Sequence, residues 1–118
     1  MSHERNAEMQ RCIDECESCR SACLTAVTYC LDRGGRYADA LLVRMLIDCA
    51  DMCTTCADFL LRDSMAHRRV CEVCAEICDL CAELCATLPD DEMLGDCAAD
   101  CLSCAGACRD MVRSSAGM

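Results

Sequence analysis

Residues 71–85 read CEVCAEICDLCAELC, in which cysteines recur at alternating steps of three and four residues. Such steps occupy the a and d positions of a heptad, so the sulfurs lie along one stripe of a helix. The opposite face carries Glu72, Glu76, Asp79 and Glu83, which is typical of a solvated surface. This stretch therefore predicts an amphipathic helix whose buried stripe consists of cysteine.

The same steps recur in three other segments, with one step of seven residues between Cys23 and Cys30. The four groups are Cys12, Cys16, Cys19, Cys23 and Cys30; Cys49, Cys53 and Cys56; Cys71, Cys74, Cys78, Cys81 and Cys85; and Cys97, Cys101, Cys104 and Cys108. Recurrence at about 25 residues indicates four versions of one helix. We therefore predict an all-α fold, an antiparallel four-helix bundle with a cysteine-lined core.

The helix boundaries follow from turn-forming residues. We expect a single domain over residues 1–118, with helices over about 5–32, 36–62, 64–87 and 89–113. Gly34 and Gly35 end the first helix, and Pro89 suits the first turn of the fourth, before Asp90, Asp91 and Glu92. Only Asp63 and Ser64 separate the second and third groups, so a continuous helix over 36–87 stays open. An N-cap at Asp63 or Ser64 favours four helices.

Composition narrows the function and the compartment. The 118 residues include 17 cysteines and carry a formal net charge of −10, which disfavours nucleic-acid and membrane-surface binding. No apolar run approaches the roughly 18 residues of a membrane span. The first ten residues are polar and lack a signal-peptide core, so we expect a cytosolic protein. Cytosolic thiols stay reduced, which argues against a disulfide framework.

The cysteine spacing favours metal binding over disulfides. Cβ atoms at positions i and i+4 of a helix lie about 5–6 Å apart, whereas a disulfide needs roughly 3.5–4.5 Å. A linear sulfur–metal–sulfur unit spans about 4.6 Å if its bonds match the ~2.3 Å of zinc thiolates. The seven CxxxC pairs are Cys12 with Cys16, Cys19 with Cys23, Cys49 with Cys53, Cys74 with Cys78, Cys81 with Cys85, Cys97 with Cys101, and Cys104 with Cys108.

Charge selects among the metals. Four separate tetrahedral zinc sites would leave about eight negative charges uncompensated in a poorly solvated core. One monovalent ion per thiolate would neutralise the core, and soft thiolates select Cu(I). We therefore predict storage of many Cu(I) ions per monomer and no enzyme activity. A zinc-buffering thiolate protein and a thiol redox or sensor protein remain the alternatives, although no cysteine stands apart as a reactive thiol would.

These four cysteine-bearing helices with acidic outer faces resemble the bacterial copper storage proteins, and the absence of an export leader resembles their cytosolic branch. The resemblance spans Met9 to Met111. It implies a four-helix bundle whose lumen fills with Cu(I), an association of bundles into homotetramers, and no catalysis. For a role in copper homeostasis, the expected partners are copper ions and a copper chaperone.

The candidate ligands are the seventeen cysteines and His67. His67 precedes Cys71 by four residues and so continues its stripe, which makes the His67 end of the bundle the expected entrance for copper. Met9 and Met111 lie three residues from a cysteine at that end, and they are either relay ligands or gap-filling core side chains. Met45 lies at the opposite end, where we expect an apolar plug of Leu42, Leu88 and Leu94. His3 is a weak candidate in a terminus expected to fray.

A second apolar row flanks the cysteine stripes of the second and third segments. It comprises Val43, Ile47, Ala50, Ala57 and Leu61, together with Val73, Ile77, Leu80 and Leu84. A wide core-facing arc and an interface between copies of the chain both explain this row.

Overall fold

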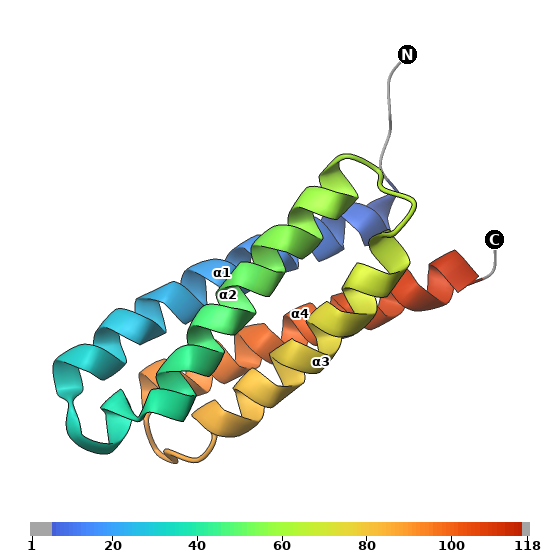
Figure 1. The fold of residues 1–118 in the computed structure, drawn as a ribbon. Coiled ribbons are helices and arrows are strands. Elements are labelled where there is room, and N and C mark those ends of the chain that lie inside the picture. The colour runs from blue at the N-terminus through green and yellow to red at the C-terminus, as the bar shows by residue number, and fades with distance from the viewer. Residues whose placement is uncertain (1–5, 117–118) are drawn as a thin grey trace.

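The structure, a computed structural model, describes residues 6–116, and side chains up to residue 114. It contains four α-helices, α1 (Ala7–Arg33), α2 (Ala40–Leu61), α3 (His67–Cys85) and α4 (Glu92–Ala116), and a short 3₁₀ helix, η1 (Gly35–Ala38). Sequence neighbours run in opposite directions in an elongated bundle (Figure 1). The predicted all-α antiparallel four-helix bundle is confirmed, and no strand occurs within residues 6–116.

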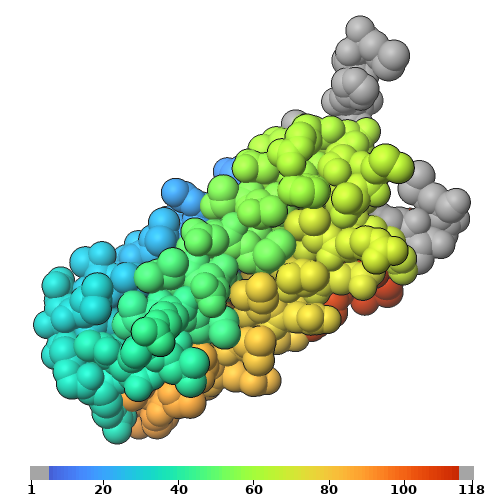
Figure 2. Space-filling model, viewed as in Figure 1, coloured from blue at the N-terminus to red at the C-terminus, as the bar shows by residue number. Residues whose placement is uncertain are grey.

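The helices form a ring in chain order. α1 and α3 each pack against α2 and α4, while the diagonal pairs of described helices make no close backbone contact. The molecule measures 52 × 23 × 20 Å and is rod-shaped (Figure 2). One end of the rod, here called the His67 end, comprises residues 7–13, 58–72 and 108–114. The opposite end, called the Asp91 end, comprises residues 30–46 and 85–95.

The junction between α2 and α3 corrects one expectation. Asp63 has a left-handed backbone, with φ of 51°, its N–H donates to the Leu60 carbonyl, and the Ser64 N–H donates to the Phe59 carbonyl. This hydrogen-bond pattern is the Schellman end of α2, in which Asp63 takes the place that glycine usually holds. Asp63 therefore ends α2 and is not an N-cap. Ser64 also starts the turn that leads into α3, because its hydroxyl accepts a hydrogen bond from the Ala66 N–H at 3.1 Å and its carbonyl accepts one from the His67 N–H. α3 begins at His67, after Ala66.

Two other helix starts also lie later than expected. α2 begins at Ala40, because residues 35–38 form η1 and the Asp39 carboxylate accepts a hydrogen bond from the Leu42 N–H at 3.1 Å. α4 begins at Glu92 because the Asp91 carboxylate caps it, accepting from the Leu94 N–H at 2.9 Å. Pro89 therefore lies in the loop, outside the helix where it was expected. The end of α1 at Gly34, with φ of 69°, matches the expectation.

Cysteine lines the core along its whole length. Each of the seventeen cysteines is at most 1% exposed, and no polar or charged side chain among the described residues is buried. The largest buried side chains between them are Ile13, Leu46, Leu60, Leu94 and Met111. A core of small thiols and few large side chains lets the four helices surround one narrow column of sulfur. No helix in the described part of the chain is long and apolar enough to cross a membrane.

The second apolar row divides between core and surface. Ala50 and Ala57 are buried, whereas four larger members of the row are between 40% and 48% exposed. These four are Ile47, Leu61, Val73 and Leu80. The wide core-facing arc therefore accounts for the two alanines and for Val43, Ile77 and Leu84, which are partly buried against the core. The other four side chains are exposed on α2 and α3.

Candidate metal centre

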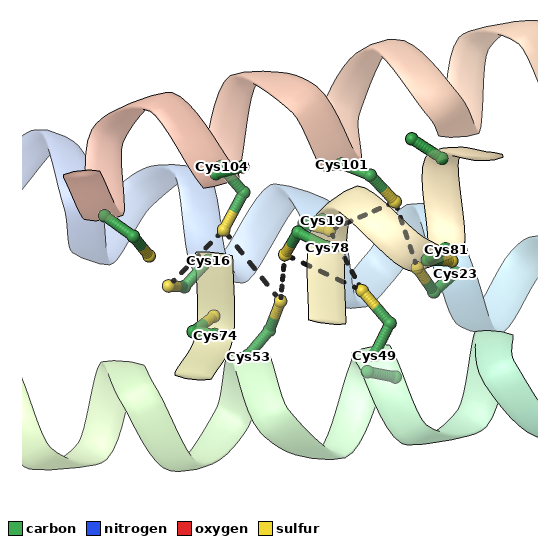
Figure 3. Close-up of a cluster of buried hydrophobic side chains, with 14 of the residues drawn as sticks. Cys16, Cys19, Cys23, Cys49, Cys53, Cys74, Cys78, Cys81, Cys101 and Cys104 are labelled. Atoms are coloured by element: carbon green, nitrogen blue, oxygen red, sulfur yellow. Dashed lines mark hydrogen bonds between the residues drawn. The ribbon is translucent and has the colours of Figure 1, made fainter. Parts of the chain in front are cut away.

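The sulfur atoms of all four helices converge on the bundle axis (Figure 3). Neighbouring sulfurs lie 3.6–4.0 Å apart. The contacts connect α1 with α2, α1 with α4, and α2 with α3. The pairs are Cys12 with Cys108, Cys16 with Cys104, Cys19 with Cys49 and Cys101, Cys23 with Cys97 and Cys101, Cys49 and Cys53 with Cys78, Cys53 with Cys104, and Cys56 with Cys71. The structure therefore brings thirteen of the predicted ligands into contact with another sulfur: nine in one connected run and four in the pairs Cys12 with Cys108 and Cys56 with Cys71.

Four groups of cysteines have sulfur atoms that all lie within 4.8 Å of one another. They are Cys12, Cys56, Cys71 and Cys108; Cys16, Cys56, Cys74 and Cys108; Cys19, Cys23, Cys49 and Cys101; and Cys19, Cys53, Cys78 and Cys104. Cys19, Cys56 and Cys108 each belong to two groups. Because sulfurs are shared, the groups cannot all act as independent four-ligand sites. Metal ions bound in two groups that share a sulfur would be bridged by that thiolate.

The closest sulfur pairs differ from the CxxxC pairs that the spacing suggested. Every sulfur contact of 4.0 Å or less among the described residues joins two different helices. The physical reason is that residues i and i+4 are separated by about 6 Å of helix rise, while side chains of facing helices interdigitate. The CxxxC pair Cys19 and Cys23 nevertheless lies within 4.8 Å, close to the roughly 4.6 Å span of a linear sulfur–metal–sulfur unit, so pairs within a helix and pairs between helices both suit such an ion.

Three cysteines lie at or beside the Asp91 end. Cys97 contacts Cys23 at 3.9 Å, and the neighbouring thiols of Cys81 and Cys97 raise the pKa of Cys85. Cys30 is fully buried, yet its sulfur has no sulfur partner within 4.0 Å among the described residues. Burial is the main cause that raises the pKa of Cys30. Cys74, Cys81 and Cys85 also have no such contact, but other thiols are the main cause of their pKa shifts, and Cys74 belongs to one of the groups of four. Of these four cysteines, only Cys30 has a pKa shift whose main cause is burial.

Hydrogen bonds between thiols polarise the column. The contact between Cys19 and Cys101 lowers the pKa of Cys19 and raises that of Cys101, because only one of the two can donate its proton. At the His67 end, the hydrogen bond from Cys108 is the main cause that lowers the pKa of Cys12, to about 5. A thiol with a lowered pKa supplies the thiolate that metals bind.

His67 lies at the first turn of α3, one turn before Cys71, and is half-buried. Its Nδ1 lies 2.8 Å from the Ser64 carbonyl oxygen. In the tautomer that donates this hydrogen bond, Nε2 carries the lone pair that a metal ion needs. The loop that ends α2 thus orients the imidazole ring that begins α3.

The methionines divide between the two ends. Met111 is 2% exposed and Met9 is half-buried, and both pack with the core at the His67 end. Met45 is half-buried at the opposite end, where Leu42, Leu88 and Leu94 are buried, as expected of an apolar plug. The burial of Met111 favours a packing role. His3 lies outside the described residues.

Sequence reasoning missed the residues that close the Asp91 end. Tyr29, Tyr37 and Arg33 gather there with Asp91, through hydrogen bonds and ring contacts. No helical period connects residues of α1, η1 and the loop before α4, so no spacing in the sequence indicated this group. Its effect is to close the end away from His67.

The donor set of the core is uniform. Within residues 6–114 it offers thiol sulfur and no buried carboxylate, amide or hydroxyl. Hard cations such as Mg²⁺ and Ca²⁺ require oxygen ligands, whereas soft ions prefer thiolates. The column therefore suits soft metal ions.

The comparison with known proteins agrees with this chemistry. The sequence model of a family described as copper storage protein matches residues 5–113. A protein of Nitrosospira multiformis is 38% identical, with a TM-score of 0.84 over 90% of this chain and 95% of that one.

Two further similar structures are those of copper storage proteins with copper bound. The Cu(I)-bound copper storage protein 3 of Bacillus subtilis is 30% identical, with a TM-score of 0.84 over 89% of this chain and 98% of that one. A cytosolic copper storage protein of Streptomyces lividans, with five coppers, is 32% identical, with a TM-score of 0.78 over 90% of this chain and 92% of that one. With a sulfur-lined bundle and a family match over nearly its whole length, the chain belongs to the copper storage protein family.

Proposed function

We propose that this protein stores Cu(I) in the sulfur column of its bundle, with all seventeen cysteines as candidate ligands and His67 at the entrance. The observation that carries the proposal is the sharing of Cys19, Cys56 and Cys108 between neighbouring groups of four sulfurs. Shared sulfurs suit bridging Cu(I) thiolates, in which one sulfur binds two or more ions. They do not suit four isolated tetrahedral zinc sites.

Charge balance supports a high copper content. The column has no cationic side chain within it, so ionised thiolates need metal ions as counter-charges. About one Cu(I) per thiolate leaves the core neutral. We therefore expect roughly 15–20 ions per monomer, with His67 as the ligand that supplements sulfur.

The proposal extends to the setting of the protein. The Streptomyces lividans relative is described as cytosolic, and we propose the same location here. We propose no catalytic activity, because the described core lacks the polar groups that would act on a substrate.

We also propose association into a homotetramer through the exposed side chains of Ile47, Leu61, Val73 and Leu80. A copper chaperone is the proposed supplier.

The test is anaerobic titration of reduced protein with Cu(I) in competition with a strong Cu(I) chelator. A plateau at roughly 15–20 ions per monomer is expected, measured by elemental analysis. A plateau at about four ions would contradict the copper store. The parallel titration with Zn(II) provides the control, and tighter retention of zinc than of copper at that plateau would identify a zinc buffer instead.

A further inference from the structure

The surface of this acidic protein changes character at the His67 end. Six exposed arginines gather there and are here called the arginine collar: Arg11, Arg62, Arg68, Arg69, Arg109 and Arg113. Residues 7–13, 58–72 and 108–114 carry these six arginines and five carboxylates. The rest of the described chain carries four arginines and fifteen carboxylates. The formal charge is therefore slightly positive at this end and strongly negative elsewhere.

Ion pairs neutralise only part of the collar. Arg11 and Arg113 share one carboxylate, that of Asp110, and Arg11 lies 2.8 Å from its Oδ2 atom. Arg62 lies over the Phe59 ring at 4.5 Å, and neither Arg62 nor Arg69 has an ion-pair partner among the described residues. These two arginines flank His67 in the sequence. Glu8, Asp58 and Asp63 also have no ion-pair partner among the described residues. The excess of this end is therefore one positive charge by formal count, against a strongly negative remainder of the surface.

This charge does not suit the arrival of a bare cation. Arginine remains protonated at any physiological pH, so the collar repels Cu(I) that carries only neutral ligands. A complex of Cu(I) with two thiolates is anionic, and it is more so when the thiols carry carboxylates. The overall charge of −10 would repel such a complex from most of the surface. The collar attracts it at one end.

We propose that the His67 end receives copper as an anionic complex of Cu(I) with small carboxylate-bearing thiolates, which the arginine collar attracts and orients. Guanidinium groups bind carboxylates through paired hydrogen bonds, which holds the carrier with its copper towards the column. This proposal rests on the proposed storage function and names a second route of delivery beside the copper chaperone.

The transfer itself is a ligand exchange. A bond between copper and a carrier sulfur breaks as a bond between copper and a core sulfur, such as that of Cys108, forms. The proton of the core thiol passes to the departing thiolate, which leaves as a free thiol. Copper remains Cu(I), and nothing is oxidised or reduced. The second carrier sulfur is replaced in the same way by a second core thiol.

The test compares loading rates from two copper donors with similar sulfur chemistry and opposite peripheral charge. One donor is the Cu(I) complex of glutathione, which carries carboxylates, and the other is that of cysteamine, which carries ammonium groups. The variant Arg62→Gln/Arg69→Gln removes the unpaired charges of the collar. The variant Arg36→Gln/Arg44→Gln removes the same charge from exposed arginines at the Asp91 end and is the matched control.

With the glutathione complex at low ionic strength, the collar variant should load roughly three to ten times more slowly than the wild type. The control variant should load at nearly the wild-type rate. With the cysteamine complex, the collar variant should load as fast as the wild type or faster. At about 1 M salt, where the screening length is about 3 Å, the difference between the proteins should disappear. Stopped-flow absorbance of the copper–thiolate bands follows each rate.

A further variant separates charge from packing. Arg62→Lys/Arg69→Lys keeps both charges, so its rate with the glutathione complex should recover most of the wild-type value. Equal slowing with both donors, or equal slowing in the collar and control variants, would overturn the proposal. The equilibrium copper content is measured for every variant. A low content in the wild type would count against the storage function, whereas the collar affects the rate alone.

Discussion

The hydroxyl of Tyr29 donates a hydrogen bond of 2.5 Å to the Oδ2 atom of Asp91, which joins the end of α1 to the start of α4. The other carboxylate oxygen of Asp91 accepts the bond from the Leu94 N–H that caps α4. The Arg33 guanidinium lies 4.3 Å from the Tyr37 ring centre and covers the same corner. One carboxylate therefore serves both the helix cap and the closure of the Asp91 end.

Asp91 should make the stability of the metal-free protein depend on pH in the acid range. The hydrogen bond from Tyr29, followed by the bond from the Leu94 N–H, lowers the pKa of Asp91 below its ordinary value of 3.8. A lowered pKa means that the stabilisation is present above pH 3.8 and is lost as the pH falls through the folded-state value. Asp91→Asn should therefore lower the thermal midpoint at pH 7, and the difference from wild type should shrink below about pH 3.8.

Circular dichroism melts of reduced protein between pH 2 and 7 would measure this dependence. Asp90→Asn is the matched control, because Asp90 has φ of 66°, a conformation that asparagine also tolerates. A difference between Asp91→Asn and wild type that stays constant across this range would contradict the role given to the carboxylate.

The double variant Cys74→Ser/Cys78→Ser should lose one or more copper ions while its helices stay intact. Both sulfurs belong to groups of four within the column, and serine hydroxyls are poor ligands for a soft ion. Cys30→Ser is the matched control, since Cys30 is buried without a close sulfur partner. It should lose at most one ion. The copper content at saturation, measured against the same chelator, decides the comparison, and an unchanged content in the double variant would show that these thiols are not ligands.

His67→Ala should slow the loading or removal of copper while reducing the total content by no more than about one ion. The reason is the position of the ring one turn before Cys71, at the end where the column is not closed by the Tyr29 group. Met65→Ala, a change at a fully exposed side chain in the same loop, is the control. Transfer rates to a chelator test the prediction, and unchanged kinetics in His67→Ala would remove His67 from the uptake route.

The reduced, metal-free protein should already be helical. Its core contains buried leucines, alanines and thiols that pack without metal, and cysteine behaves as a small hydrophobic side chain. This behaviour would differ from that of a zinc finger, which is unfolded without its ion. Far-ultraviolet circular dichroism before and after copper addition measures it. A coil spectrum that becomes helical only with copper would show that the column forms around the metal.

Periodicity explains how much of this fold was predictable. Alternating steps of three and four fix which face of each helix is buried, so the inward position of every cysteine followed from the sequence. The junction at Asp63 did not follow. Aspartate suits both an N-cap and a left-handed turn, and the choice depends on the hydrogen bonds that Asp63 and Ser64 donate to the carbonyls of Leu60 and Phe59.

The pairing of sulfurs was also beyond the sequence. Spacing within one helix indicates neighbours along that helix, whereas the contact of Cys56 with Cys71 depends on how α2 and α3 are placed lengthwise. Cys30 illustrates the same point. It continues the stripe of α1 by heptad spacing, yet no described sulfur of another helix lies within 4.0 Å of its own sulfur. A linear pattern contains no information about this offset between helices.

The contact of 4.0 Å between the sulfurs of Cys53 and Cys104 spans the diagonal of the bundle, from α2 to α4. Sulfurs of opposite helices therefore meet on the bundle axis at this level, and the Tyr29 group covers the Asp91 end. Copper ions held in such a column would move in single file, by exchange between successive sulfurs. The deepest ions would be deposited first and withdrawn last, so the store would empty in the reverse order of its filling, and its most recent copper would always be the most available.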